Sequence, residues 1–154
     1  MNIIEHVMSR PVITCGPHDS LHVAAGRLWE HDCGALPVTD EHGHVVGMIT
    51  DRDICMAAYT KGKGLHAISV DEAMATRVIT CRPTDAIADV ERKMAQAQVR
   101  RLPVVDGQGR PVGLVSLNDL ARLTAQASKR AAVEALGTLA AIGQPRRRAM
   151  THVA

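Results

Sequence analysis

The chain has 154 residues, enough for one compact domain or for two small units with little core each. It contains one Trp, one Tyr and no Phe, so it offers no aromatic platform for stacking single-stranded nucleic acid. Residues 1–120 carry 12 basic and 15 acidic side chains, whereas residues 121–154 carry six and one. A mildly acidic body argues against nucleic-acid binding. The basic tail is expected to be solvated, with contact to nucleic acid or another acidic partner as the alternative.

The first residues, Met-Asn-Ile-Ile-Glu-His, lack the cationic start and long apolar stretch of a signal peptide. No apolar run approaches the length needed to cross a membrane. We therefore expect a cytoplasmic protein with no membrane contact and with reduced thiols. The four cysteines show no Cys-x-x-Cys spacing, and Cys15 and Cys81 are expected to be small buried hydrophobes.

The sequence repeats itself after 66 residues: residues 7–54 align with 73–120 without a gap, with 15 of 48 positions identical. In the first copy the pattern predicts a strand at 12–15, a helix over 19–31, a hairpin of 35–39 and 44–49, and a helix over 51–59. The second copy predicts the same elements at 78–81, 84–98, 102–105, 111–115 and from 117 onward. So long a period indicates a duplicated domain half, with the seam between the copies as the expected functional surface.

The segments that connect or follow the two copies also have predicted structures. Residues 60–64 are expected to form a polar linker and residues 69–74 a short helix. Thr84 is the expected N-cap of the helix that follows it. Beyond Leu120 a helix is expected to continue to Ile142, with a disordered tail after it. The predicted fold class is α/β (α+β): a duplicated β-α-β-β-α unit with pseudo-two-fold symmetry.

The strongest motif is Gly47-Met-Ile-Thr50-Asp-Arg-Asp53, repeated as Gly113-Leu-Val-Ser116-Leu-Asn-Asp119. In both copies a strand is expected to end at a hydroxyl residue, with an Asp three positions later on the same helix face. The hydroxyl and the carboxylate then point into one space beside an electropositive helix N-terminus. The carboxylate there can accept hydrogen bonds from two vicinal ribose hydroxyls, and the helix end favours a nearby phosphate.

The same pattern is close to a capping box, in which the two side chains satisfy the first N–H groups of their own helix. An ideal box has Glu or Gln at the fourth position, whereas both copies have Asp. Each copy also places a Gly three residues before the hydroxyl, where the backbone can approach a ligand closely. The two roles are compatible, because a Thr can cap through one lone pair and still donate to a ligand. Both readings stay open on the sequence.

The duplicated motifs together resemble the cystathionine-β-synthase (CBS) domain, here as a tandem pair. The resemblance covers about residues 5–125 and rests on Met8-Ser-Arg-Pro-Val-Ile-Thr14, Gly34-Ala-Leu-Pro-Val-Thr-Asp40, Val99-Arg-Arg-Leu-Pro-Val-Val-Asp106 and both Gly-x-x-Ser/Thr-x-x-Asp ends. It implies a CBS domain at residues 5–66, a second at 69–126, and a C-terminal helix with a basic flexible tail at 127–154. It further implies clefts between the repeats that bind AMP, ADP, ATP or S-adenosylmethionine, and a disc-like homodimer.

Carried over by position, the resemblance implies that Asp53 and Asp119 hold ribose hydroxyls, assisted by Thr50 and Ser116. It places the adenine and phosphate sides of the clefts at Thr14, Thr80, Ala35, Arg100 and Arg101. Arg100 and Arg101 resemble the family's basic pair that binds phosphates; the alternative is that they are ordinary solvated charges. The first copy has Gly34 and Ala35 in their place, so we expect unequal sites and favour the Asp119 cleft for a phosphorylated ligand.

No Ser/His/Asp, Cys/His or paired-acid arrangement recurs at a plausible site, so we expect no enzyme, no catalytic residue, no metal and no required cofactor. The first hypothesis is a regulatory adenosine-binding module that acts on an unknown partner protein or through its own homodimer. The alternative is a structural dimerisation module, with a stress-related role, whose clefts hold no nucleotide.

Overall fold

The computed structural model describes residues 3–125 and 129–144. The first copy contains α1 (Leu21–Glu30), β1 (Ala35–Thr39), β2 (Val45–Thr50) and α2 (Asp51–Lys61). The second contains α3 (Ile87–Ala97), β3 (Arg101–Val105), β4 (Pro111–Ser116) and α4 (Leu117–Ala125), followed by α5 (Lys129–Ile142). Three 3-10 helices precede or connect the copies: η1 (Ile4–His6), η2 (Leu65–Ala67) and η3 (Val70–Glu72).

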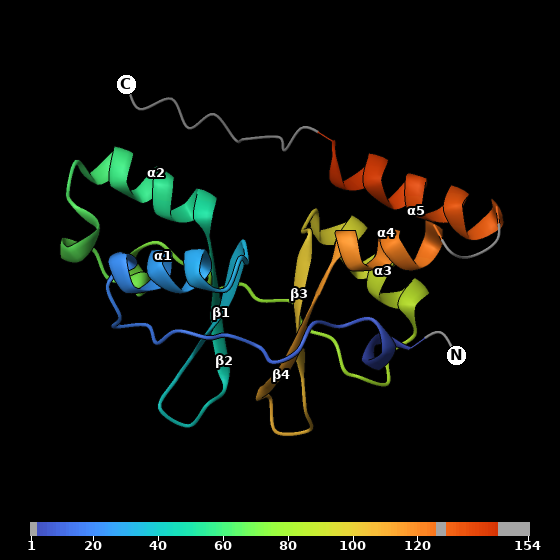
Figure 1. The fold of residues 1–154 in the computed structure, drawn as a ribbon, viewed down its shortest axis with the longest axis horizontal. Helices are drawn as coiled ribbons and strands as arrows, with labels where there is room; N and C mark the ends of the chain where they lie inside the picture. The colour runs from blue at the N-terminus through green and yellow to red at the C-terminus, as the bar shows by residue number, and fades with distance from the viewer. Residues whose placement is uncertain (1–2, 126–128, 145–154) are drawn as a thin grey trace.

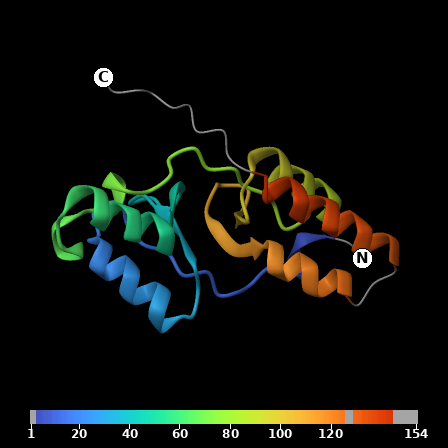
Figure 2. The ribbon, with the colours of Figure 1, turned by 90° about the horizontal axis from the view of Figure 1, so that it is seen from above.

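The two antiparallel hairpins, β1–β2 and β3–β4, lie side by side in the middle of the molecule (Figure 1). Helices α1 and α2 lie on one side of them, and α3, α4 and α5 on the other, as the view from above also shows (Figure 2). The pairing register is the same in both copies, with Ala35 opposite Thr50 and Arg101 opposite Ser116. The predicted mixed α/β fold and the internal duplication are thus confirmed.

The strands expected at 12–15 and 78–81 are each reduced to one parallel bridge, formed by Cys15 with Val38 and by Cys81 with Val104. Both cysteines are 2% exposed, which confirms their prediction as buried hydrophobes. Burial raises the pKa of the Cys15 thiol to about 11 and that of Cys81 to about 12, so both stay protonated at neutral pH.

The segment that precedes each copy packs on the other copy. The first runs from η1, beside α3, across to α1 (Figure 1). On this path Ser9 pairs with Leu114 of β4, as Ala75 pairs with Met48 of β2 in the equivalent second segment. We call residues 9–15 and 75–81 the crossing segments. The 3-10 helices η1 and η3 also pack on the copy that they do not precede directly in the repeat pattern: η1 on the second copy and η3 on the first. The Ile4 amide of η1 donates to the Asp85 carbonyl at 3.0 Å, and the Val70 amide of η3 donates to the Asp19 carbonyl at 2.9 Å.

Each hydrophobic core is completed by the exchanged segment. Ile4 and Met8 belong to the core of the second copy, whereas Ile68 and Val70 belong to the core of the first. Ile4 and Val70 are fully buried. Neither copy therefore closes its core with its own leading residues, and the two copies depend on each other for burial of apolar surface.

The glycine of each repeated motif is required by this exchange. A Cβ atom on Gly113 would lie 2.6 Å from Met8 Sδ and 3.2 Å from the Ser9 carbonyl oxygen. A Cβ on Gly47 would overlap the Met74 sulfur and approach the Ala75 carbonyl oxygen to 3.2 Å. The close approach expected for a ligand at these glycines is thus made by the crossing segments of the chain itself.

The end of the second copy differs from the sequence prediction. The single helix expected to run on to Ile142 is wrong, because α4 ends at Ala125 and the separate helix α5 packs against α3 and α4. This position buries Thr138 and places Ile142, 7% exposed, in the core of the second copy. The basic tail around residues 146–148 lies outside the described residues. Among the helices of residues 3–125 and 129–144, none is both long and apolar enough to cross a bilayer.

Thr84 is not the N-cap of α3, because the helix begins at Ile87 and its N-cap is Ala86, without a side-chain cap. Asp85 instead stabilises the turn before the helix: its carboxylate accepts from the Arg82 amide at 3.2 Å and from Lys93 Nζ at 2.9 Å. Burial alone would raise the pKa of this carboxyl, but the two hydrogen bonds outweigh it and hold the pKa below its usual value. Asp19 is held by Arg27 in the equivalent way.

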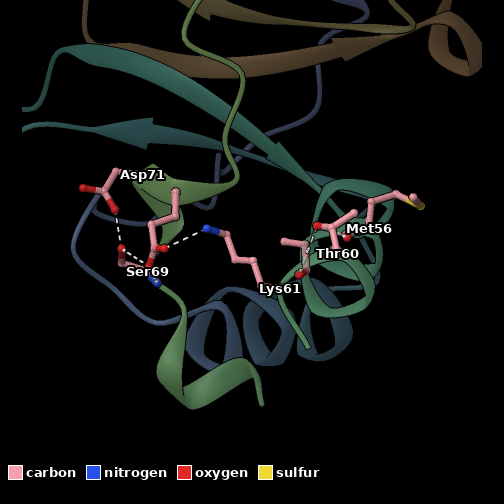
Figure 3. Close-up of polar contacts among 7 residues, drawn as sticks. Met56, Thr60, Lys61, Ser69 and Asp71 are labelled. Carbon is pink, nitrogen blue, oxygen red and sulfur yellow. Dashed lines mark hydrogen bonds and ion pairs between the residues drawn. The ribbon is translucent and has the colours of Figure 1, made fainter. Parts of the chain in front are cut away.

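The linker between the copies is tied to the end of α2. Lys61, the last residue of α2, points toward the segment that carries Ser69 and Asp71 (Figure 3). Its Nζ donates to Glu72 Oε2 at 2.9 Å, and the Ser69 amide donates to Glu72 Oε1 at 3.0 Å. Hydrogen bonds from Lys61 and Ser69 lower the pKa of Glu72 from its usual value of 4.5 to about 2.

Gly113→Ala is expected to destabilise the fold by about 1–3 kcal/mol, because the added methyl collides with Met8 and the Ser9 carbonyl. Chemical denaturation measures the loss. Gly107→Ala, in the β3–β4 turn where nothing lies within 4 Å, is the matched control and should be close to neutral. Equal stability of the two variants would contradict the tight crossing.

Lys61→Met should lower the melting temperature at pH 6 and by much less at pH 2. A carboxyl with a lowered pKa contributes its full stability above its unfolded value, and the contribution falls away as pH drops from 4.5 through about 2. Thermal unfolding across this range is the measurement, and Lys63→Met, two residues further along the exposed linker, is the control. A pH-independent difference between Lys61→Met and the wild type would count against the assignment.

Candidate functional site

The repeated Ser/Thr-x-x-Asp motifs form helix caps. The Asp53 amide donates to Thr50 Oγ1 at 3.2 Å, while Asp53 Oδ2 accepts from the Thr50 amide at 3.0 Å and from Thr50 Oγ1 at 2.7 Å. Ser116 and Asp119 repeat these bonds, with the Ser116 amide and hydroxyl 2.8 and 2.6 Å from Asp119 Oδ2. Helix capping, one of the two roles that the sequence allows for this motif, is therefore observed in both copies.

Capping uses only one oxygen of each carboxylate. Within residues 3–125 and 129–144, no group donates a hydrogen bond to Oδ1 of Asp53 or of Asp119. Both aspartates are half-buried in the first turn of an α-helix. Each therefore keeps one acceptor that is fixed in direction by the cap and available to an outside hydroxyl.

A cavity of about 330 Å³ lies at the seam of the two copies. It combines the first crossing segment with the end of α1, the start of β1 and one residue of β4 from the other copy. The lining residues are Ser9, Arg10, Pro11, Val12, Ile13, His31, Asp32, Cys33, Ala35 and Leu114. Its volume is at the lower end of the range of small-molecule sites.

Ala35 is the sequence-predicted site residue that lines this cavity, and it pairs across the hairpin with Thr50. The register thus places Thr50 beside one lining residue, but neither Thr50 nor Asp53 is among the residues that line the cavity. The contributions of Ser9 to Ile13 and of His31 to Cys33 were not predicted from the sequence. Motif spacing carries no signal for these residues, because they come together only through the crossing of the first segment.

Thr14 and Thr80 are both half-buried at equivalent positions of the crossing segments. The Thr14 carbonyl accepts a hydrogen bond from Arg27 Nη1 at 2.8 Å, so its backbone is fixed to α1. Neither threonine is among the residues that line the cavity. Their contact with a ligand stays a prediction.

The structure separates the two arginines of the expected basic pair. The Arg100 side chain is exposed, and its carbonyl accepts from the Leu117 amide at the start of α4 at 2.9 Å. Arg101 is half-buried at the start of β3, and its guanidinium ends against Gly34 of the first copy. Burial raises the pKa of the neighbouring Cys33 thiol, and the Arg101 charge acts in the opposite direction. Arg52, in the first turn of α2 in the first copy, also has an exposed side chain.

Two interlocked α/β repeats with a cavity at their seam define a tandem module, and comparison with known proteins identifies it. The CBS domain family matches the chain at residues 4–59 and 70–125. The chain therefore belongs to the CBS domain family and carries two CBS domains in tandem. The resemblance seen in the sequence is thus confirmed.

The chain is 38% identical over 121 residues to the CBS domain-containing protein YhcV of Bacillus subtilis, which covers 79% of this chain and 84% of that protein. It is 34% identical over 123 residues to an L-aspartate semialdehyde sulfurtransferase of Methanocaldococcus jannaschii, with 80% of this chain but 23% of that protein covered. A crystal structure of the CBS domain pair of protein MJ0100, in complex with 5′-methylthioadenosine and S-adenosyl-L-methionine, has a TM-score of 0.75 at 33% identity, covering 82% of this chain and 98% of that one.

Proposed function

We propose that the chain is a regulatory module that binds an adenosine compound at the seam of its two CBS domains. The observation that carries the proposal is the seam cavity, whose lining residue Ala35 pairs across the hairpin with Thr50 of the Thr50–Asp53 cap. Pro11, Val12, Ile13, Ala35 and Leu114 give it apolar walls suited to a purine ring. The CBS domain pair of MJ0100, of similar fold, is in complex with two adenosine compounds, which supports the ligand class.

The ribose is assigned to the acidic residue of the cap. Asp53 Oδ1 is free to accept from a ribose hydroxyl, and Asp119 Oδ1 has the same position in the second copy. In this proposal Thr50 and Ser116 orient the carboxylates, and Thr14, Thr80 and Ala35 lie on the base side. The first-turn N–H groups of α2 and the charges of Arg100 and Arg101 attract phosphate.

The module acts as a sensor and not as a catalyst in this proposal, with no required cofactor. A ligand that binds one arrangement of the chain better than another shifts the population toward it, and the shift is relayed to a partner protein or through a dimer. We also propose a cytoplasmic location, where its four free thiols stay reduced.

A homodimer is proposed through the outer face of α1 and α2. In the second copy α5 packs on the equivalent face of α3, where Gly137 and Thr138 of α5 line a hollow together with Ala88 and Ala95 of α3. The position in α1 that corresponds to Ala95 is Trp29, which is 88% exposed. Tyr59 on α2 is 81% exposed, so the chain places its only Trp and Tyr in solvent on neighbouring helices. This exposure also favours the alternative, a dimerisation module without nucleotide.

Asp53→Asn is expected to weaken adenosine-ligand binding about tenfold or more, because a charge-assisted hydrogen bond is worth roughly 1.5–3 kcal/mol. Asn keeps an acceptor for the cap, so the melting temperature should change little. Calorimetry with AMP, ATP, 5′-methylthioadenosine and S-adenosylmethionine is the measurement. No heat with any of them for the wild type at millimolar concentration would reject the proposed function and leave the dimerisation module.

Trp29→Asp is expected to convert a dimer into a monomer, because it places a charge at the centre of the proposed apolar contact. Light scattering should give twice 16.5 kDa for the wild type and 16.5 kDa for the variant. Val133→Asp, at a 68% exposed position on the outer face of α5, is the control that should stay dimeric. A wild type that is monomeric at high concentration would rule out this dimer.

A further inference from the structure

The two copies present equivalent helical faces, and the chain covers only one of them. Helix α5 packs against α3 and α4, and no other helix of the described chain takes the equivalent place on α1 and α2 (Figure 1). Among the described side chains of residues 3–125, the exposed large apolar ones all lie on these two helices: Val23 and Trp29 on α1, and Met56 and Tyr59 on α2. An exposed apolar surface of this kind marks a site of association.

The contact of α5 with the second copy is firm at one end and incomplete elsewhere. Thr138 is buried, and Ile142 enters the core of the second copy. Between the two helices, however, Gly137 of α5 and Ala88 and Ala95 of α3 line a hollow of about 330 Å³. A gap of this kind forfeits part of the dispersion energy that close packing would supply. We therefore expect that α5 can be displaced without unfolding of the second copy.

Helix α5 reaches the face of α3 and α4 from within its own chain, and this connection decides which face is left for a partner. A tethered segment acts at an effective concentration of roughly millimolar, whereas a second chain arrives only at its concentration in solution. A second copy therefore competes poorly with α5 for α3 and α4. On α1 and α2 the described chain offers no such competitor.

The occupant that fits the open face is the same face of a second copy. A two-fold axis places identical residues opposite each other, and an interface of this kind closes after two chains. Trp29 and Tyr59 can each bury roughly 150–250 Å², together about half of the ~800 Å² that each partner buries in a standard interface. Pairing with the second copy of another chain is blocked, because α5 already lies on α3 and α4.

We propose that α5 is a built-in cover for the second copy, and that it limits the chain to a head-to-head dimer in which only the first copies of the two chains touch. The inference rests on the homodimer of the proposed function and adds its orientation and the element that prevents further assembly. The second copies lie at the two ends of this dimer, which is elongated and not the disc expected from the sequence. Displacement of α5 opens a second face for association.

Substitutions on the two sides of α5 test the cover. Thr138→Arg places a charge in the buried contact and should lift α5, so the mass in light scattering should rise above twice 16.5 kDa. Ile142→Asp, further along the same contact, is an independent way to lift the helix. Leu136→Arg, at a 64% exposed position of α5, is the matched control and should stay dimeric. Added to Trp29→Asp, Thr138→Arg should turn a monomer into a dimer, because only the second face is then open.

Spin labels measure the orientation in the full chain. With Cys33 and Cys55 replaced by Ser, a label is attached at Lys63→Cys, after α2, or at Leu136→Cys, on α5. The distance between the two chains should be clearly shorter for the label at 63 than for the label at 136. Equal distances, or the reverse order, would overturn the head-to-head arrangement.

Circular dichroism confirms that each variant is folded. An unchanged dimer for both Thr138→Arg and Ile142→Asp would overturn the role of α5 and leave the proposed homodimer standing. A monomeric Leu136→Arg would overturn this inference as well, because it would assign the contact to the outer face of α5. A wild type that is monomeric at high concentration would reject the homodimer and this inference with it.

Discussion

The exchange of leading segments is the constraint on which the rest of the structure depends. Ile4 and Met8 complete the core of the second copy, and Ile68 and Val70 complete that of the first. Units of this size bury too little apolar surface on their own, so burial of these residues contributes much of what holds each half together. The crossing segments that deliver them pass so close to β2 and β4 that the strands must carry Gly47 and Gly113. The same path supplies one wall of the seam cavity.

Local patterns in the sequence were sufficient for most of the elements. Short apolar runs separated by turns that contain Asp and Gly predicted both hairpins, and helical periodicity predicted α1, α2 and α3 to within a few residues. The exchange could not be predicted, because a repeat shows which positions are equivalent and not which copy a segment packs on. The break before α5 was missed for a related reason. The helical pattern continues past Ala125, and a separate helix is favoured by burial of Thr138 and Ile142 against the second copy, which the local pattern does not show.

The site was predicted in part. The hydroxyl and carboxylate of each motif do share one helix face, as their spacing requires, and the cap that they form uses one carboxylate oxygen of each aspartate. Arg100 and Arg101 are adjacent in sequence but diverge in space, because neighbouring residues at a strand start point in opposite directions. That Arg101 lies against Gly34 follows from the packing of the two copies, which a one-dimensional alignment does not contain.

The exchanged segments also have a consequence for the origin of the chain. A half-length ancestor would have carried its leading residues without a core of its own in which to bury them. Two such polypeptides could each have packed their leading segment on the other, which would have completed both cores. Fusion of the two reading frames then kept the arrangement and removed its dependence on concentration. In a fused chain the paired positions need not be alike, and here a glycine on one side faces an arginine from the other.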